Sequence, residues 1–103
     1  MRSMHLSEGA GELRITIRLL GVLQEACGGV ERLEVEIRRG ESLLDLLRRL
    51  PARLRNRVLV DGGVAPDLLI LVDGVELSCL GPAERVRLEG AREVVLIPVI
   101  HGG

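Results

Sequence analysis

The sequence contains no phenylalanine, tyrosine or tryptophan. Proteins that bind single-stranded nucleic acid stack its bases on such rings, so this mode of binding is excluded. Acidic and basic side chains are interspersed and the formal net charge is −1, which gives no overall attraction to nucleic acid or to anionic lipid. We therefore expect no direct nucleic-acid partner, no membrane partner, and a core built from Leu, Ile and Val.

Cysteine is also scarce, and long apolar runs are absent. Cys27 and Cys79 have neither metal-ligand spacing nor a CxxC arrangement, so we expect two reduced thiols in a cytoplasmic protein, with no metal site. No apolar run approaches the roughly 20 residues that cross a bilayer. Residues 1–11 are polar and Gly-rich, so we expect a flexible N-terminal segment rather than a secretory signal.

Two strands are predicted by alternation of apolar and polar residues. From Glu12 to Leu19 the apolar residues occupy every second position, and the pattern returns at Leu33, Val35 and Ile37. Between them, residues 20–29 contain a short helical turn before a Gly-Gly pair. In an antiparallel pair the arginines of the first strand, Arg14 and Arg18, would face the glutamates of the second, Glu34 and Glu36.

The period then changes to that of a helix. Leu43, Leu47, Leu50 and Leu54 fall on one face of an amphipathic helix. Ser42 followed by Asp45 indicates a capping box at its start. Pro51 predicts the end of this helix, a kink, or the first residue of a second short helix.

The second half of the chain is predicted to consist mainly of strands. A strand is predicted over residues 67–72, of which 68–72 are apolar, and Asp73-Gly74 followed by Val75-Glu76-Leu77 is a hairpin signal. The last strand is predicted from about residue 93 to residue 100. Its residues 94–100 are apolar on both faces, so we expect it in the sheet interior, between two other strands, with part of its second face open to a partner. The fold class predicted is α+β, with a mixed sheet packed on one main helix, over residues 12–100.

Few residues are suited to catalysis. His5 and His101 lie near the two ends of the sequence, without a rigid surrounding to tune them. There is no phosphate-binding glycine motif and no nucleophile elbow. Five arginines between positions 48 and 57 are read in the first place as a solvated helix face, and in the second as a surface for an acidic partner or an RNA phosphate. We predict that the chain is not an enzyme.

The remaining candidate for chemistry is the carboxylate of Gly103. A terminal carboxylate is ionised and a poor electrophile until adenylation converts it to a mixed anhydride, which sulfur or an amine can attack. Two residues without Cβ atoms, Gly102 and Gly103, fit a narrow channel. We expect residues 101–103 to be a flexible tail. Gly-Gly alone is a weak signal, because Gly28-Gly29 and Gly62-Gly63 occur as internal pairs.

These residues resemble the ubiquitin-like β-grasp sulfur carriers and protein modifiers. The segment Leu96 to Val99 before Gly-Gly is similar to the endings of the molybdopterin synthase small subunit and the thiamin sulfur carrier. The ending His101-Gly102-Gly103 is instead typical of the ubiquitin-related modifier branch. Residues 67–81, DLLILVDGVELSCLG, are similar to a strand and turn of that branch, although the aromatic residue of that segment is missing here.

The resemblance implies a ubiquitin-like β-grasp fold and a function as a carrier. The Gly103 carboxylate would be adenylated by a ubiquitin-activating-type enzyme that uses ATP, and would become a thiocarboxylate; no bound cofactor is implied. The sulfur would pass to a sulfur-transfer or tRNA thiolation enzyme, or the tail would be joined to lysines of target proteins. His101 and Gly102 would serve tail recognition. Val95, Ile97 and Val99 would bind the partner.

Two alternatives stay open. The first is the small subunit of molybdopterin synthase, a sulfur donor for molybdenum cofactor biosynthesis; its usual ending has a small residue before Gly-Gly, and the bulk of His101 argues against it. The second is a non-catalytic interaction domain whose glycine ending is accidental.

Lysine is absent, and all fourteen basic residues are arginine. The chain therefore offers only its N-terminal amine as an acceptor, so if it modifies proteins we expect it on targets as single units rather than lysine-linked chains. A general replacement of lysine by arginine, unrelated to conjugation, explains the same absence equally well.

Overall fold

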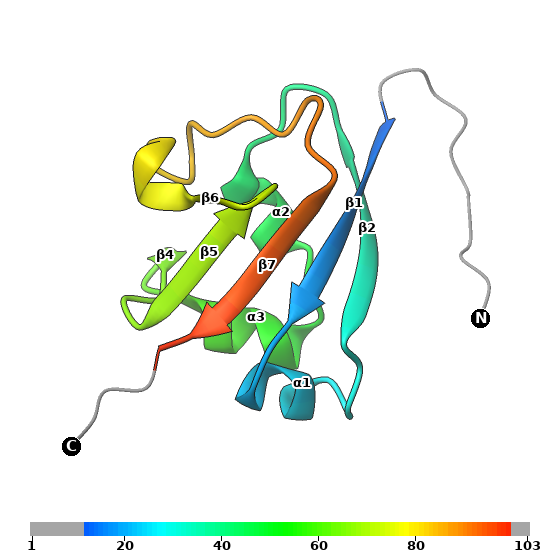
Figure 1. The fold of residues 1–103 in the computed structure, drawn as a ribbon, viewed down its shortest axis with the longest axis vertical. Coiled ribbons are helices and arrows are strands. Elements are labelled where there is room, and N and C mark those ends of the chain that lie inside the picture. Colours follow the sequence, from blue (N-terminus) through cyan, green and yellow to red (C-terminus); the bar gives the residue numbers. More distant parts are fainter. Residues whose placement is uncertain (1–11, 100–103) are drawn as a thin grey trace.

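A computed structural model describes residues 12–99 (Figure 1). Its main sheet has five strands in the order β2-β1-β7-β5-β6. β7 is parallel to β1 and antiparallel to β5, so the last strand lies between two others as the sequence predicts. The strands are β1 Glu12–Leu19, β2 Arg32–Arg38, β5 Leu68–Val72, β6 Val75–Glu76 and β7 Glu93–Pro98, and a separate ladder joins β3 Leu59–Val60 to β4 Gly63–Val64.

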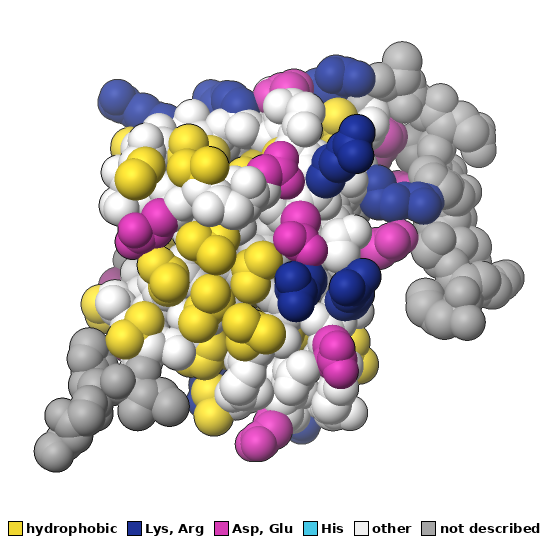
Figure 2. Space-filling view, in the orientation of Figure 1, with side chains coloured by type: hydrophobic (Ala, Val, Ile, Leu, Met, Phe, Trp, Pro, Cys, Tyr) yellow, Lys and Arg dark blue, Asp and Glu magenta, His cyan; other side chains and the backbone are white. Residues whose placement is uncertain are grey.

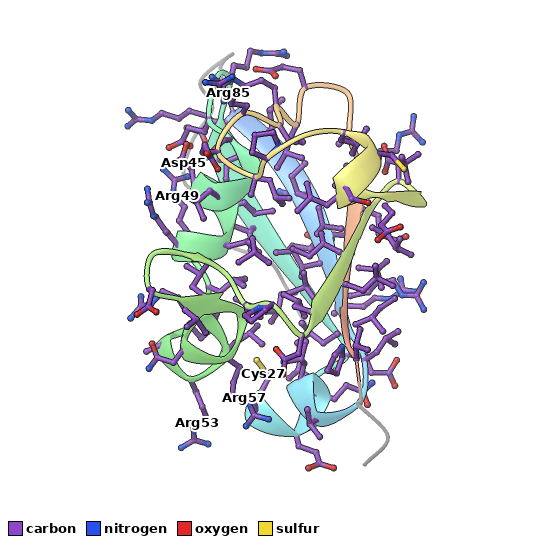
Figure 3. The ribbon with its side chains drawn as sticks, turned by 90° about the vertical axis from the view of Figure 1, so that its left-hand side faces the viewer. Cys27, Asp45, Arg49, Arg53, Arg57 and Arg85 are labelled. Carbon is purple, nitrogen blue, oxygen red and sulfur yellow. The ribbon has the colours of Figure 1, made fainter. Side chains whose placement is uncertain are left out.

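Two short helices, α2 Leu43–Arg48 and α3 Ala52–Val58, cover one face of this sheet. A third, α1 Val22–Ala26, lies at the end of the sheet where β1 ends, and a 3-10 turn, η1 Leu77–Cys79, lies beside the edge strand β6 (Figure 1). The side view shows α2 and α3 on one side of the sheet, which leaves its other face without a helix (Figure 3). Within the described part of the chain, no helix has the length and apolar character needed to cross a bilayer.

The helix predicted after Ser42 is divided in two at Pro51. Pro51 has no backbone N–H to continue α2, and its fixed φ, −53°, suits it to the N-cap of α3. The leucines expected on one face, Leu43, Leu47, Leu50 and Leu54, are nevertheless all buried. The two helices thus present one apolar stripe to the sheet, where it meets the inward residues of β1, β5 and β7.

The first two strands pair in antiparallel register, as predicted. Arg14 lies opposite Glu36 and forms ion pairs with Glu34 at 3.7 Å and with Glu36 at 3.5 Å. The expectation for Arg18 was wrong. Arg18 lies opposite Arg32, and its guanidinium instead contacts the carboxylate of Glu93 on β7 at 3.8 Å.

α2 begins with the capping box that the sequence predicts. The Ser42 hydroxyl accepts from the Asp45 backbone N–H at 3.2 Å, and the Asp45 carboxylate accepts from the Ser42 backbone N–H at 2.9 Å. This hydrogen bond from the Ser42 backbone is the main reason that the pKa of Asp45 lies below its ordinary value of 3.8. Ser42 itself is only 3 % exposed, so its loss is not compensated by water.

Replacing Ser42 by alanine is expected to lower the free energy of unfolding by about 1 kcal/mol at neutral pH, because an orphan N–H loses its acceptor. Urea denaturation followed by circular dichroism measures this, with Ser78→Ala at an exposed serine as the matched control, expected to change stability by less than about 0.5 kcal/mol. The pKa of Asp45 is lower in the folded protein than in the unfolded chain. Its carboxylate therefore contributes fully to the free energy of unfolding above the unfolded pKa, and this contribution is lost as the pH falls through the folded pKa. Equal losses in the two variants would contradict the capping role.

Candidate docking face and tail exit

The uncovered face of the sheet is apolar where β5 and β7 meet. Val94 and Leu96 point into the core, so the alternate residues Val95 and Ile97 point outward, beside Leu71 and Leu69 of β5. We call the four residues Leu69, Leu71, Val95 and Ile97 the outer apolar face. Figure 2 shows apolar side chains gathered over these two strands.

Val95 is buried without being part of the core. It is 7 % exposed, but it does not join the buried cluster that contains its neighbours Val94 and Leu96. The prediction that β7 is apolar on both faces and open on one side is thus explained by register: β7 is a central strand whose second face has no helix above it.

Charged side chains border the outer apolar face on the side of β1 and β2 (Figure 2). Arg18 contacts Glu93, and Arg14 contacts Glu34 and Glu36, all with partly exposed side chains. Such surface pairs contribute little to stability. On this side they give the apolar centre a polar border in which the charges are paired, as at the rim of a protein–protein interface.

β7 leaves the sheet beside the start of α1. The Leu96 carbonyl accepts from the Leu20 N–H at 3.3 Å, so the polar backbone groups of Leu96 point towards β1. Alternate residues of a strand share this direction, so the nitrogen of Pro98 points the same way, past the last residue that β1 pairs with β7, which is Leu19. A proline is tolerated in this central strand because an N–H at that position would have no strand partner.

Gly21 lies beside Pro98 at this exit, and its backbone conformation is the reason that glycine suits this position. It has φ +60° and ψ −135°, a conformation that side chains disfavour, and a Cβ added there would lie 3.4 Å from Pro98 Cγ. On the other side, the Val99 N–H donates to the Asp67 carbonyl at 2.8 Å. Of the three residues predicted to bind a partner, Val95 and Ile97 belong to the outer apolar face, and Val99 follows them along the strand, 43 % exposed.

The predicted reactive and tail-recognition residues, Gly103, Gly102 and His101, lie outside the described residues, as do residue 100 and the predicted N-terminal segment 1–11. The structure therefore fixes the point from which the tail starts, at Val99, and describes nothing beyond it.

Asp73 also positions β7, a role that the sequence did not predict. Asp73 was predicted only as a turn residue, and it does occupy the hairpin turn with φ +48°. Its carboxylate also accepts from the backbone N–H groups of Arg92 at 3.0 Å and Glu93 at 2.9 Å, which anchors the first residue of β7. The Asp73-Gly74 pair predicts only the turn. The contact with β7 could not be predicted, because it involves residues about twenty positions further along the chain.

The other candidates for chemistry do not gather into a site. Cys27 is partly buried and Cys79 is exposed, and within residues 12–99 no three His, Cys, Asp or Glu side chains are grouped to hold a metal ion. Among the five helix arginines, Arg48 contacts Asp45 at 3.7 Å and Arg49 contacts Glu41 at 2.8 Å. Arg53 and Arg57 are exposed on α3 and form no ion pair with a described residue.

No protein-family model matches this chain, and no curated protein matches it. Solved structures do. The HVO 2177 protein of Haloferax volcanii is 24 % identical with a TM-score of 0.76, and the alignment covers 100 % of this chain and 98 % of that one.

Two further solved structures are similar to this chain. Urm1 from Trypanosoma brucei is 24 % identical with a TM-score of 0.68, covering 95 % of this chain and 100 % of its own. The small archaeal modifier protein 1 from Methanosarcina acetivorans is 21 % identical with a TM-score of 0.68, covering 89 % and 98 %. At these identities the likeness establishes the fold. The chain has the ubiquitin-like β-grasp fold that its resemblance to sulfur carriers and protein modifiers implies.

Proposed function

We propose that this protein is a ubiquitin-like sulfur carrier and protein modifier, in which an ATP-dependent activating enzyme adenylates and then thiocarboxylates Gly103. The observation that carries the proposal is the placement of an outer apolar face on the same central strand, β7, that leads within a few residues to Gly102-Gly103. A partner that covers this face holds the strand from which the tail starts. The names of two structural neighbours, both modifiers, support the same function.

The chemistry resides in the tail and the energy comes from ATP. A carboxylate oxygen of Gly103 attacks the α-phosphorus of ATP and pyrophosphate leaves, which gives an acyl adenylate. A hydrosulfide ion supplied by the activating system then attacks the carbonyl carbon, the bond from that carbon to the AMP oxygen breaks, and AMP leaves together with a proton, which gives the thiocarboxylate. Gly102 and Gly103 bring no Cβ atoms into the narrow space that the nucleotide and the tail must share.

The activated carboxyl group of Gly103 then serves either sulfur delivery or conjugation to a target protein. In the first, the thiocarboxylate gives its sulfur to a transfer enzyme, with tRNA thiolation as the proposed process. In the second, a target lysine amine displaces the activating group and forms an amide with Gly103. Because this chain contains no lysine, conjugates should carry single units.

The test is the intact mass of the protein before and after incubation with ATP, a sulfur source and an extract of its native host. The first mass shows whether the native chain ends at Gly103, as the proposal requires. The second is expected to increase by one oxygen-to-sulfur exchange, and only when ATP is present. An unchanged mass in an extract that thiocarboxylates another carrier would rule out the proposed role.

A further inference from the structure

A groove lies at the end of β7 away from the tail. The space has a volume of about 430 Å³, is open to solvent, and is bordered by the β5–β6 turn and the loop that leads to β7. Val72, which lines it, pairs with Val94 near the start of β7, whereas Leu68 at the other end of β5 pairs with Pro98 beside the tail exit. The groove therefore lies at the opposite end of the β5–β7 pair from the point where the tail starts.

The carboxylates of the groove are already engaged with the backbone. Asp73 accepts from the N–H groups of Arg92 and Glu93. Glu89 accepts from the N–H of Gly40, and this bond is the main reason that its pKa lies below the ordinary value. Both acidic groups serve the fold, and Glu89 is ionised at neutral pH.

The arginines of the groove are less occupied. Arg87 donates to the Glu84 carbonyl at a long 3.3 Å, and it contributes to lowering the pKa of Glu89 without forming an ion pair with it. Arg85 forms no ion pair or side-chain hydrogen bond with any residue of 12–99. A guanidinium presents a planar fork of donors that matches a carboxylate. The groove thus contains two arginines with guanidinium N–H donors left to offer, beside two carboxylates, Asp73 and Glu89, whose oxygens already accept from backbone N–H groups.

Apolar side chains complete the groove. Val75 and Leu80 are each 44 % exposed, which places them among the most exposed large apolar residues of the described chain. A phosphate backbone would use the arginines but would gain nothing from these two residues, and the chain has no aromatic ring on which a base could stack. A peptide with both carboxylate and apolar side chains would use all four residues.

We propose that this groove binds an extended acidic segment of a partner protein, with its carboxylates on Arg85 and Arg87 and an apolar side chain against Val75 and Leu80. The proposal rests on these four residues and does not depend on the chemistry of Gly103. It gives the protein a second contact, separate from the outer apolar face, that can be occupied while the tail is engaged.

The probe is a dye-labelled peptide of alternating Glu and Leu with blocked ends, and its binding is measured by fluorescence anisotropy. The double variant Arg85→Gln/Arg87→Gln is expected to bind at least about tenfold more weakly, because two charge-assisted contacts are lost. The matched control, Arg53→Gln/Arg57→Gln, changes the net charge equally at the opposite end of the molecule and is expected to bind like the parent chain (Figure 3).

Two peptide variants test the proposal on the unaltered protein. Replacing Glu by Gln in the peptide should abolish binding, and replacing Leu by Ser should weaken it. Equal weakening by the two double variants, binding that survives loss of the peptide's charge, or chemical-shift changes that map away from the groove would each overturn the proposal. So would tighter binding of bulk tRNA that depends on Arg85 and Arg87, because it would assign the groove to nucleic acid.

Discussion

A chain from which Gly103 is removed is expected to gain no sulfur when it is incubated with ATP and the activating system. The remaining carboxylate, on Gly102, would lie one residue closer to β7, short of the nucleotide by about 3.5 Å. Because adenylation requires the attacking oxygen close to phosphorus and in line with the leaving group, a displacement of this size removes nearly all the rate. Intact-mass measurement over time gives the result directly.

The deletion should leave the folded domain unchanged, since the described core ends before the tail. Thermal unfolding of the shortened chain and of the parent is therefore the control, and the two curves should coincide. Gly103→Ala keeps the length and adds one Cβ, so it separates the requirement for reach from the requirement for a narrow end. Sulfur gain by the shortened chain at a rate near that of the parent would refute the proposed role of Gly103.

Placing a charge on the outer apolar face is expected to reduce activation by about 100-fold. In Ile97→Asp, the partner loses an apolar contact worth roughly 1.5–3 kcal/mol and must also desolvate a carboxylate. The reaction is measured as sulfur gain against the concentration of activating enzyme, where the loss should appear as a higher concentration for half-maximal rate. The tail itself is unaltered, so its rate at saturation should change much less.

Val60→Asp is the matched control for this variant. Val60 is also β-branched and apolar, is 47 % exposed, and lies in the small β3–β4 ladder rather than on the main sheet. It should be activated like the parent chain. Circular dichroism and thermal unfolding of both variants distinguish weaker docking from loss of fold. If Ile97→Asp remains folded and is activated normally, the outer apolar face is not the docking surface.

The elements that depend on local pattern were predictable from the sequence. The alternation in residues 12–19 matches β1, and the pair Ser42 and Asp45 forms the capping box, because both signals arise within a few residues. The effect of Pro51 is also local, but the sequence alone allowed three outcomes: the end of the helix, a kink, or the start of a second short helix. The structure selects a second helix, because Leu54 and Val58 find buried positions when α3 begins at Ala52.

The contacts that depend on register were not predictable. Alternation places Arg18 on the outward face, but it does not say which residue lies beside it. β7 inserts next to β1 and brings Glu93 within reach, whereas the antiparallel hairpin brings Arg32 opposite. The second role of Asp73 and the groove at Arg85 and Arg87 were not predictable for the same reason. Both depend on segments that are distant in the sequence and become neighbours only in the folded sheet.

The position of β7 links synthesis of the protein to its folding. β7 is the last strand in chain order, yet it lies in the sheet between β1 and β5, so each of these strands has one unpaired edge until residues 93–98 have left the ribosome. Until then the growing chain presents two open strand edges and an uncovered apolar core, which favours capture by chaperones or proteases over stable folding. A prematurely terminated chain lacks both the central strand and the glycines that follow it. The cell therefore obtains a stable domain only together with the strand that carries the tail.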